Sequence, residues 1–192
     1  GLDECDRHLS AGKRGMVGLH AAFTCSDETI EAAAALAAKH GVGVHVHVAE
    51  AVDDAAAGAR LENYATDEWL RGVFATAVDG EKKADRIALI AVGGYGRREL
   101  APFSDLDVLL VHDGVKNIGD IASKIWYPVW DAGLKLGHSV RTPKETMQMC
   151  TTDLDTATAL VTARRLAGSE SLAAEVIAGA SDIWRRRGRE WL

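Results

Sequence analysis

Cysteine residues and long apolar runs are scarce in this sequence. Among 192 residues there are three cysteines, Cys5, Cys25 and Cys150, and they are dispersed, odd in number and without metal-type spacing. This usage favours a reducing, cytoplasmic setting over a disulfide framework. No apolar run approaches the roughly 20 residues of a transmembrane helix, and the first residues show no signal-peptide pattern. We therefore expect a protein without membrane association.

Positive charge is also in short supply. The 22 Lys and Arg residues are outnumbered by 28 Asp and Glu residues, so the net charge is −6. That balance argues against a broad nucleic-acid surface, although it allows a local triphosphate pocket. The basic end formed by residues 185–189 is interpreted as a solvated last helical turn. With 47% hydrophobic and 26% charged residues, the composition is that of an ordinary soluble globular protein.

A glycine-rich turn between two apolar runs is the most informative pattern in the chain. Residues 87–92 and 106–111 are short apolar runs of the kind that buried strands use. Between them, Gly93 and Gly94 allow a sharp turn and leave backbone N–H groups free to approach a triphosphate. Arg97, which follows closely, can supply positive charge. A dinucleotide loop is the alternative, but its glycines should lead into a helix.

Two carboxylates open the second apolar run. Asp105 and Asp107 lie two apart, so in a strand both side chains project from one face and can reach one metal ion. Mg²⁺ prefers oxygen ligands, typically one or two carboxylates together with substrate phosphates. Each element alone is consistent with an ordinary turn or a solvated strand entry. In this order, the combination indicates a metal-dependent nucleotidyl-transfer site.

These residues carry a family resemblance. Residues 91–107, 130–142 and 153–168 resemble the nucleotidyltransferase domain of the bacterial PII-protein uridylyltransferases, so the resemblance covers roughly residues 60–192. Arg98 departs from the family, which usually has glycine there. The full-length family carries a hydrolytic metal domain and sensing domains beyond this point. We therefore expect this chain to lack nucleotide removal and glutamine sensing.

The resemblance implies an activity and a set of roles. It implies transfer of UMP from UTP to a tyrosine hydroxyl of the PII signalling protein, with pyrophosphate leaving and Mg²⁺ or Mn²⁺ required. Asp105 and Asp107 would be the metal ligands. Gly93, Gly94 and Ser104 would contact the nucleotide phosphates through backbone donors and a hydroxyl.

A general base is not assigned by these motifs. No acid lies within residues 134–141, and Asp153 is the best remaining candidate, although it precedes an apolar helical pattern and is equally a helix N-cap. His138 is either a proton-transfer group or a structural residue of a strand. Trp126, Tyr127 and Trp130, at near-helical spacing, are interpreted as core residues rather than a base-stacking platform.

The first quarter of the chain has a different character. Residues 14–29 and 41–50 resemble an amidohydrolase of the deaminase and chlorohydrolase branch, and their local pattern predicts a strand, a helix and a strand. In that family His47 would be a Zn²⁺ or Fe²⁺ ligand and Glu50 the proton-transferring acid. An eight-fold barrel needs about 250 residues, so this stretch can provide only one or two of its units.

The expected organisation follows from these two resemblances. Residues 1–53 form an amidohydrolase-like β-α-β fragment of barrel type, 54–62 a joint, and 63–192 a nucleotidyltransferase-like domain. The predicted fold class is α+β (mixed α/β), with a small mixed sheet flanked by helices and with C-terminal helices. One of these helices is expected over residues 154–166. A nucleotidyltransferase is the favoured function; a metal-dependent amidohydrolase fragment and a non-catalytic fragment or fusion are the alternatives.

Overall fold

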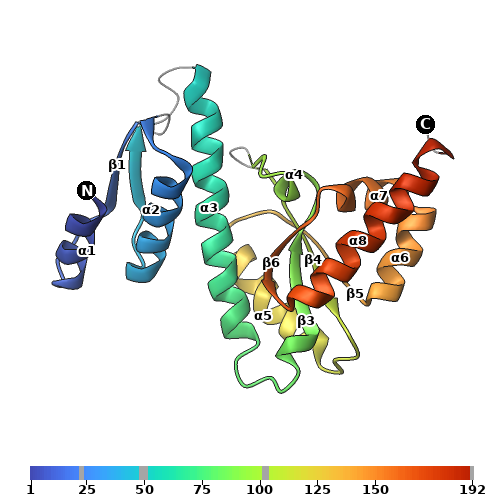
Figure 1. The fold of residues 1–192 in the computed structure, drawn as a ribbon. Helices are drawn as coiled ribbons and strands as arrows, with labels where there is room; N and C mark the ends of the chain where they lie inside the picture. The colour runs from blue at the N-terminus through green and yellow to red at the C-terminus, as the bar shows by residue number, and fades with distance from the viewer. Residues whose placement is uncertain (22–23, 48–51, 101–103, 191–192) are drawn as a thin grey trace. The chain divides into compact units, whose positions relative to one another are not determined.

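The computed structural model describes residues 1–21, 24–47, 52–100 and 104–190, with the backbone alone for 52–60 and 190. The chain divides into two compact units, Gly1–Trp69 and Leu70–Leu192 (Figure 1). Helix α3, Val52–Ala77, contributes residues to both. The finer division into residues 1–53, 54–62 and 63–192 remains a prediction.

The first unit contains a β-α-β arrangement. Its elements are α1 (Leu2–Ser10), β1 (Val17–Ala21), α2 (Asp27–His40) and β2 (Val44–His47). Strands β1 and β2 are parallel, with Val17 opposite Val44. Helix α2 begins at the predicted N-cap, where Ser26 Oγ accepts a hydrogen bond from the Thr29 N–H, and it ends at Gly41 in the left-handed conformation. Within the described residues this sheet has two strands and closes no barrel.

An ionic cluster joins helices α1 and α2. Lys39 Nζ lies 2.8 Å and His40 Nε2 2.6 Å from Asp6 Oδ1. Hydrogen bonds from Lys39 and then His40 lower the pKa of Asp6 to about 2. Leu9, Val17 and Ala33 belong to the buried core of the unit. The structure thus contains the predicted strand, helix and strand, and it adds helix α1, which precedes them in the chain.

The second unit is built on a four-stranded mixed sheet in the order β5-β4-β3-β6. Strands β3 (Ile87–Ala91) and β4 (Leu106–His112) are antiparallel, as a chain turning back at Gly93 requires. Strand β5 (Leu136–Arg141) runs parallel to β4. Strand β3 is buried at every position because it lies between two neighbours and under helices.

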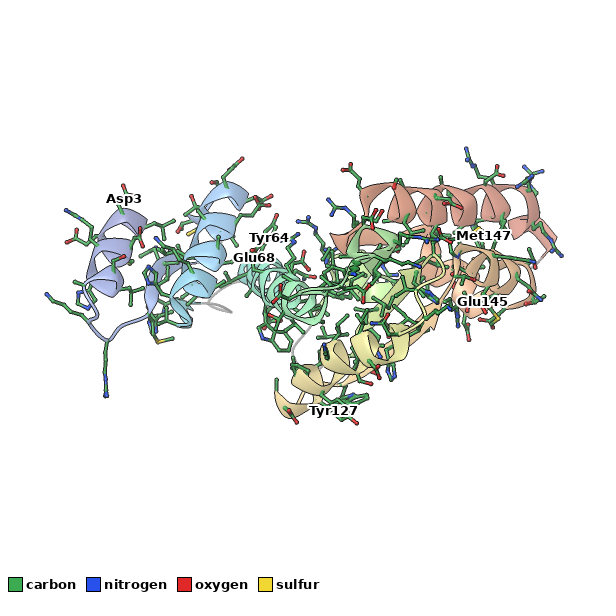
Figure 2. The ribbon with its side chains drawn as sticks, turned by 90° about the horizontal axis from the view of Figure 1, so that it is seen from below. Asp3, Tyr64, Glu68, Tyr127, Glu145 and Met147 are labelled. Carbon is green, nitrogen blue, oxygen red and sulfur yellow. The ribbon has the colours of Figure 1, made fainter. Side chains whose placement is uncertain are left out.

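Helices cover the sheet. Helix α5 (Ile118–Asp131) packs against β5 and continues through Pro128. Helices α6 (Pro143–Thr152), α7 (Leu154–Val161) and α8 (Glu170–Arg187) lie together to the right of the sheet in Figure 1 and pack against one another. Met147 of α6, labelled in Figure 2, lies so close to Gly179 of α8 that a Cβ there would come within 2.6 Å of its sulfur.

One buried cluster joins these helices to strands β3 and β4. Its members are apolar residues of β3, β4, α6, α7 and α8: Ala88, Ile90, Leu109, Val111, Cys150, Leu160, Leu172, Ala173, Val176 and Ala180. Burial of large aliphatic side chains contributes roughly 1.5–3 kcal/mol each.

Three short helices complete the element order. They are η2 (Ala84–Arg86), α4 (Gly93–Gly96) and η3 (Gly188–Glu190).

The last sheet strand corrects the sequence-based expectation. The helix expected over residues 154–166 ends at Val161, and Arg164–Gly168 forms edge strand β6, antiparallel to β3. Gly168, the last residue of β6, has φ 82°, and a Cβ at this position would come within 2.3 Å of the Ile87 carbonyl oxygen. Pairing with β3 overrides the local helical pattern.

The predicted mixed α/β fold class is confirmed. None of the helices in the described part of the chain is long and apolar enough to cross a membrane.

Candidate active site

The glycine turn leaves strand β3 at the point where β4 begins. The Val92 N–H donates to the Asp107 carbonyl oxygen at 3.0 Å, and Gly93 then takes φ 59°. The Arg97 N–H donates to the Gly93 carbonyl at 3.2 Å, so Gly93–Gly96 form one helical turn. The turn is too short to be the long helix of a dinucleotide-binding loop.

Buried contacts anchor this turn from behind. Tyr95 is buried, its carbonyl accepts a hydrogen bond from Arg164 Nη2 at 3.1 Å, and the guanidinium carbon lies 4.9 Å from the centre of its ring. Gly96 faces the Thr162 carbonyl oxygen, which a Cβ would approach to 2.7 Å. Strand β6 and its preceding connection therefore hold the turn in place.

Arg98 occupies the left-handed region of backbone conformation, with φ 60°. Among the described residues, Arg98 is the one non-glycine residue whose φ is positive. Glycine adopts that conformation without the steric cost that a Cβ brings. The departure noted in the sequence thus falls at a position where glycine is favoured for a physical reason.

Asp107 is held between two glycines. A Cβ on Gly93 would lie 3.1 Å from Asp107 Oδ2, and a Cβ on Gly137 would lie 2.1 Å from Oδ1. Gly137 is the partner of Asp107 in the parallel pairing of β4 with β5. The carboxylate therefore fills the space that two missing side chains leave.

The carboxylate pair has the electrostatics of a cation site. Burial, and then the charge of Asp105, raise the pKa of Asp107. Asp105 is exposed, with Lys135 Nζ at 3.9 Å from its Oδ1. Within the described residues no group of three or more His, Cys, Asp or Glu side chains could hold a metal ion. The pair fits an ion that takes its other ligands from phosphates and water, as Mg²⁺ does.

A cavity of about 320 Å³ extends from Asp107 between the sheet and helix α7. This volume is at the lower end of the range for small-molecule sites. Its walls combine residues of β4, β5 and α7 with the residue before the glycine turn: Val92, Asp107, Val108, Leu109, Gly137, His138, Ser139, Arg141, Asp155, Thr156, Ala159 and Leu160. The turn, one carboxylate and the cavity thus form one continuous site.

Two other residues expected at the nucleotide lie near the turn. Arg97 Nε donates to Glu99 Oε2 at 2.7 Å, and both side chains are substantially exposed. Ser104 is half-buried directly before β4. Residues 101–103 lie outside the described part of the chain. Gly94 has space around it, since a Cβ there would meet only Arg97 Nη2 at 3.9 Å.

Asp153 and His138 are engaged in structural contacts. Asp153 is the N-cap of α7, and its Oδ2 accepts hydrogen bonds from the Thr156 N–H at 2.9 Å and from the Thr156 hydroxyl. These bonds, first that of the Thr156 side chain, lower the pKa of Asp153. The His138 ring centre lies 5.2 Å from that of Trp126 and 5.5 Å from that of Trp130. Trp126 is buried as expected, but Tyr127 and Trp130 are exposed, so the core interpretation is wrong for these two.

The residues of the hydrolytic alternative are only partly described. His47 is exposed at the end of β2, with its ring centre 5.6 Å from that of His45. Glu50 lies outside the described residues, so the predicted His47 and Glu50 pair stays a prediction.

The sequence predicts that the strand near residues 134–141 passes closest to the site, but it assigns no role there to Gly137, Ser139 or Arg141. Gly137, Ser139 and Arg141 alternate along the strand, so they project from the face that Asp107 and Leu109 also use. The alternation was visible in the sequence as small and polar residues at every second position. What the sequence could not show was the parallel register that places Gly137 opposite Asp107 and Arg141 opposite Val111.

Comparison with known proteins finds similarity over part of the chain. The chain is 45% identical, over 124 residues, to the bifunctional uridylyltransferase/uridylyl-removing enzyme of Streptomyces coelicolor. This segment resembles a uridylyltransferase. The enzymes with the same description from Mycobacterium tuberculosis and Corynebacterium glutamicum are 44% identical over 108 residues and 40% identical over 105 residues.

The similarity is limited in extent. The three alignments cover 64%, 55% and 52% of this chain, but only 14%, 13% and 14% of the relatives' own lengths. No family model matches the chain. The predicted resemblance is therefore confirmed for a segment of the chain.

Proposed function

We propose that this chain is a nucleotidyltransferase that transfers UMP from UTP to a tyrosine hydroxyl of a PII-type signalling protein. The observation that carries the proposal is the position of the Asp107 carboxylate, which lies between Gly93 and Gly137 at the end of the cavity. A glycine turn in contact with a half-buried carboxylate suits a phosphate and its counter-ion. The similarity to uridylyltransferases supports uridylyl as the transferred group.

Asp105 and Asp107 are the proposed ligands of Mg²⁺ or Mn²⁺. When bound, such an ion neutralises charge on the phosphates at the reacting centre. Burial and the neighbouring Asp105 charge disfavour the ionised form of Asp107, so this carboxylate gains from a cation. Backbone N–H groups at Gly93 and Gly94 and the Ser104 hydroxyl are the proposed phosphate contacts, and Arg97 adds positive charge nearby.

The proposed step is an in-line displacement at the α-phosphorus. The tyrosine oxygen forms a bond to this phosphorus, and the bond from phosphorus to the oxygen bridging the α- and β-phosphates breaks. Pyrophosphate leaves with the electron pair of that bond, and the phenol proton is released to solvent. Asp153 was the candidate base, but its carboxylate accepts two hydrogen bonds in capping α7, which favours the N-cap alternative.

Calorimetric titration of UTP into the full chain with Mg²⁺ tests the proposal. We expect metal-dependent binding that favours UTP over ATP and is lost in Asp105→Asn/Asp107→Asn. Asp120→Asn is a matched control, because it removes an exposed carboxylate from the start of α5, away from the cavity lining. Unchanged UTP binding in the double variant would contradict the proposal.

The acceptor and location belong to the same proposal. Incubation of the chain with UTP, Mg²⁺ and a purified PII protein should add the mass of one UMP to a tyrosine of PII. A PII variant with phenylalanine at the modified tyrosine should gain no mass. A cytoplasmic location is supported by three cysteines that are free thiols.

No observation in the described residues favours the hydrolytic alternative. His45 and His47 supply two imidazoles on an exposed strand, without a third metal-binding side chain in reach among the described residues. Metal analysis of the purified chain tests it, because a hydrolytic centre would retain about one transition-metal ion per chain.

A further inference from the structure

The cavity wall formed by β5 carries an arginine that lies outside the expected nucleotide contacts. Arg141 pairs with Val111 at the far end of the parallel β4–β5 ladder. It lies four residues beyond Gly137, on the same face, so about 13 Å of strand separates them. Both line the cavity, together with Ser139 halfway along. The cavity therefore has a carboxylate at one end and a guanidinium toward the other.

The guanidinium of Arg141 has no hydrogen-bond or ion-pair partner within the described residues. Its charge still acts on its surroundings. It adds to the hydrogen bonds from Thr156 that lower the pKa of Asp153, and it opposes the burial that raises the pKa of the Cys150 thiol. A half-buried arginine without a carboxylate partner retains its five donors for a ligand.

Arg97 is placed differently. Its Nε already donates to Glu99 Oε2 at 2.7 Å, and its side chain is 45% exposed. An anion would have to compete with this carboxylate for Arg97, whereas Arg141 makes no ion pair in the described residues and acts on the Glu145 and Asp153 carboxylates only through its charge. Asp155 also lines the cavity, but it is exposed on α7, where water screens its charge.

We propose that Arg141 and Ser139 form an anion subsite for the terminal phosphates of the nucleoside triphosphate. The inference rests on the proposed function, because it assigns one end of the same cavity. Arginine matches two phosphate oxygens with two parallel N–H donors, and the Ser139 hydroxyl adds a third. The subsite stabilises the charge that accumulates on pyrophosphate as it leaves.

A comparison of UTP with UMP isolates this role. Calorimetric titrations with Mg²⁺ should show that Arg141→Gln lowers the affinity for UTP about 10- to 100-fold, while the affinity for UMP changes by less than about twofold. Arg141→Lys should recover part of the loss because it keeps the charge. Ser139→Ala should lower the affinity for UTP about 2- to 10-fold.

Arg185→Gln is the matched control. Arg185 is exposed in the last turn of α8, so its loss should leave UTP affinity unchanged. Circular dichroism establishes that each variant is folded. If Arg141→Gln does not fold, Arg141→Lys and Ser139→Ala carry the test, and loss of UTP and UMP affinity in equal measure would overturn the subsite.

The outcomes separate this inference from the proposed function. If UTP binding depends on metal and on Asp105 and Asp107, but Arg141→Gln binds UTP as tightly as the unchanged chain, the subsite is wrong and the function stands. If the unchanged chain does not bind UTP, the function fails. Titration with tripolyphosphate alone then decides: binding that Arg141→Gln abolishes supports the subsite, and no binding overturns it.

Discussion

At the scale of single residues, the backbone of Arg98 offers the most direct gain in stability. Its φ of 60° is a conformation that glycine adopts without a steric cost. We expect Arg98→Gly to stabilise the second unit by about 1 kcal/mol. Urea unfolding measures the change. Arg97→Gly is the control, because Arg97 has φ −79° and glycine there should destabilise instead. Equal effects of the two substitutions would show that the turn is not strained at Arg98.

A second prediction at this scale concerns the position of the Asp107 carboxylate. A Cβ at residue 137 would lie 2.1 Å from Asp107 Oδ1, so Gly137→Ala must displace the carboxylate. We expect metal-dependent UTP affinity to fall at least about tenfold, equivalent to about 1.4 kcal/mol. Gly119→Ala has open space around the new methyl group and should leave UTP affinity unchanged. Full affinity in Gly137→Ala would mean that the position of this carboxylate does not matter for binding.

At the scale of the elements, the two interpretations of Asp153 make different predictions. As the N-cap of α7 it accepts a hydrogen bond from the Thr156 N–H, so Asp153→Ala should lower the stability of the chain. Asp153→Ser keeps a capping side chain and should restore most of that loss. A cap role predicts that UMP transfer by Asp153→Ser equals that of the unchanged chain. A loss of turnover in both variants, with stability restored in Asp153→Ser, would instead assign Asp153 to catalysis.

The elements also show where sequence reasoning succeeds and fails. Strands β3 and β4 were expected because each is a short apolar run bounded by turn residues, a signal contained within the segment itself. The sequence predicts the end of a helix where strand β6 begins, because the strand character comes from pairing with β3, more than 70 residues earlier. Likewise, Asp105 and Asp107 were predicted from their own spacing. Gly137 and Arg141 join the site only through the β4–β5 register.

At the scale of the whole molecule, acid should act on the first unit through Asp6. Lys39 and His40 lower the pKa of this carboxyl from 3.8 to about 2, so the ionised form is favoured by folding. The resulting stability is present above pH 3.8 and is lost as the pH falls through about 2. We expect Asp6→Asn to weaken the docking of α1 on α2 at neutral pH.

Hydrogen exchange of the α1 amides measures this effect. Protection in Asp6→Asn should be lower than in the unchanged chain at neutral pH, and the two proteins should converge toward pH 2. Glu31→Gln removes an exposed carboxylate from α2 and should leave α1 protection unchanged. A difference between Asp6→Asn and the unchanged chain that persists at pH 2 would show that the carboxylate charge is not what holds α1.

Two tryptophans of α5, Trp126 and Trp130, give the second unit an intrinsic fluorescent reporter. Trp126 and Trp130 contact the ring of His138, and the backbone neighbours of His138, Gly137 and Ser139, line the cavity on the other face of β5. A ligand that shifts this strand changes the surroundings of both indoles at once. Intrinsic tryptophan emission can therefore report occupancy of the cavity from the opposite side of the sheet, without a label and without a chromophore in the ligand.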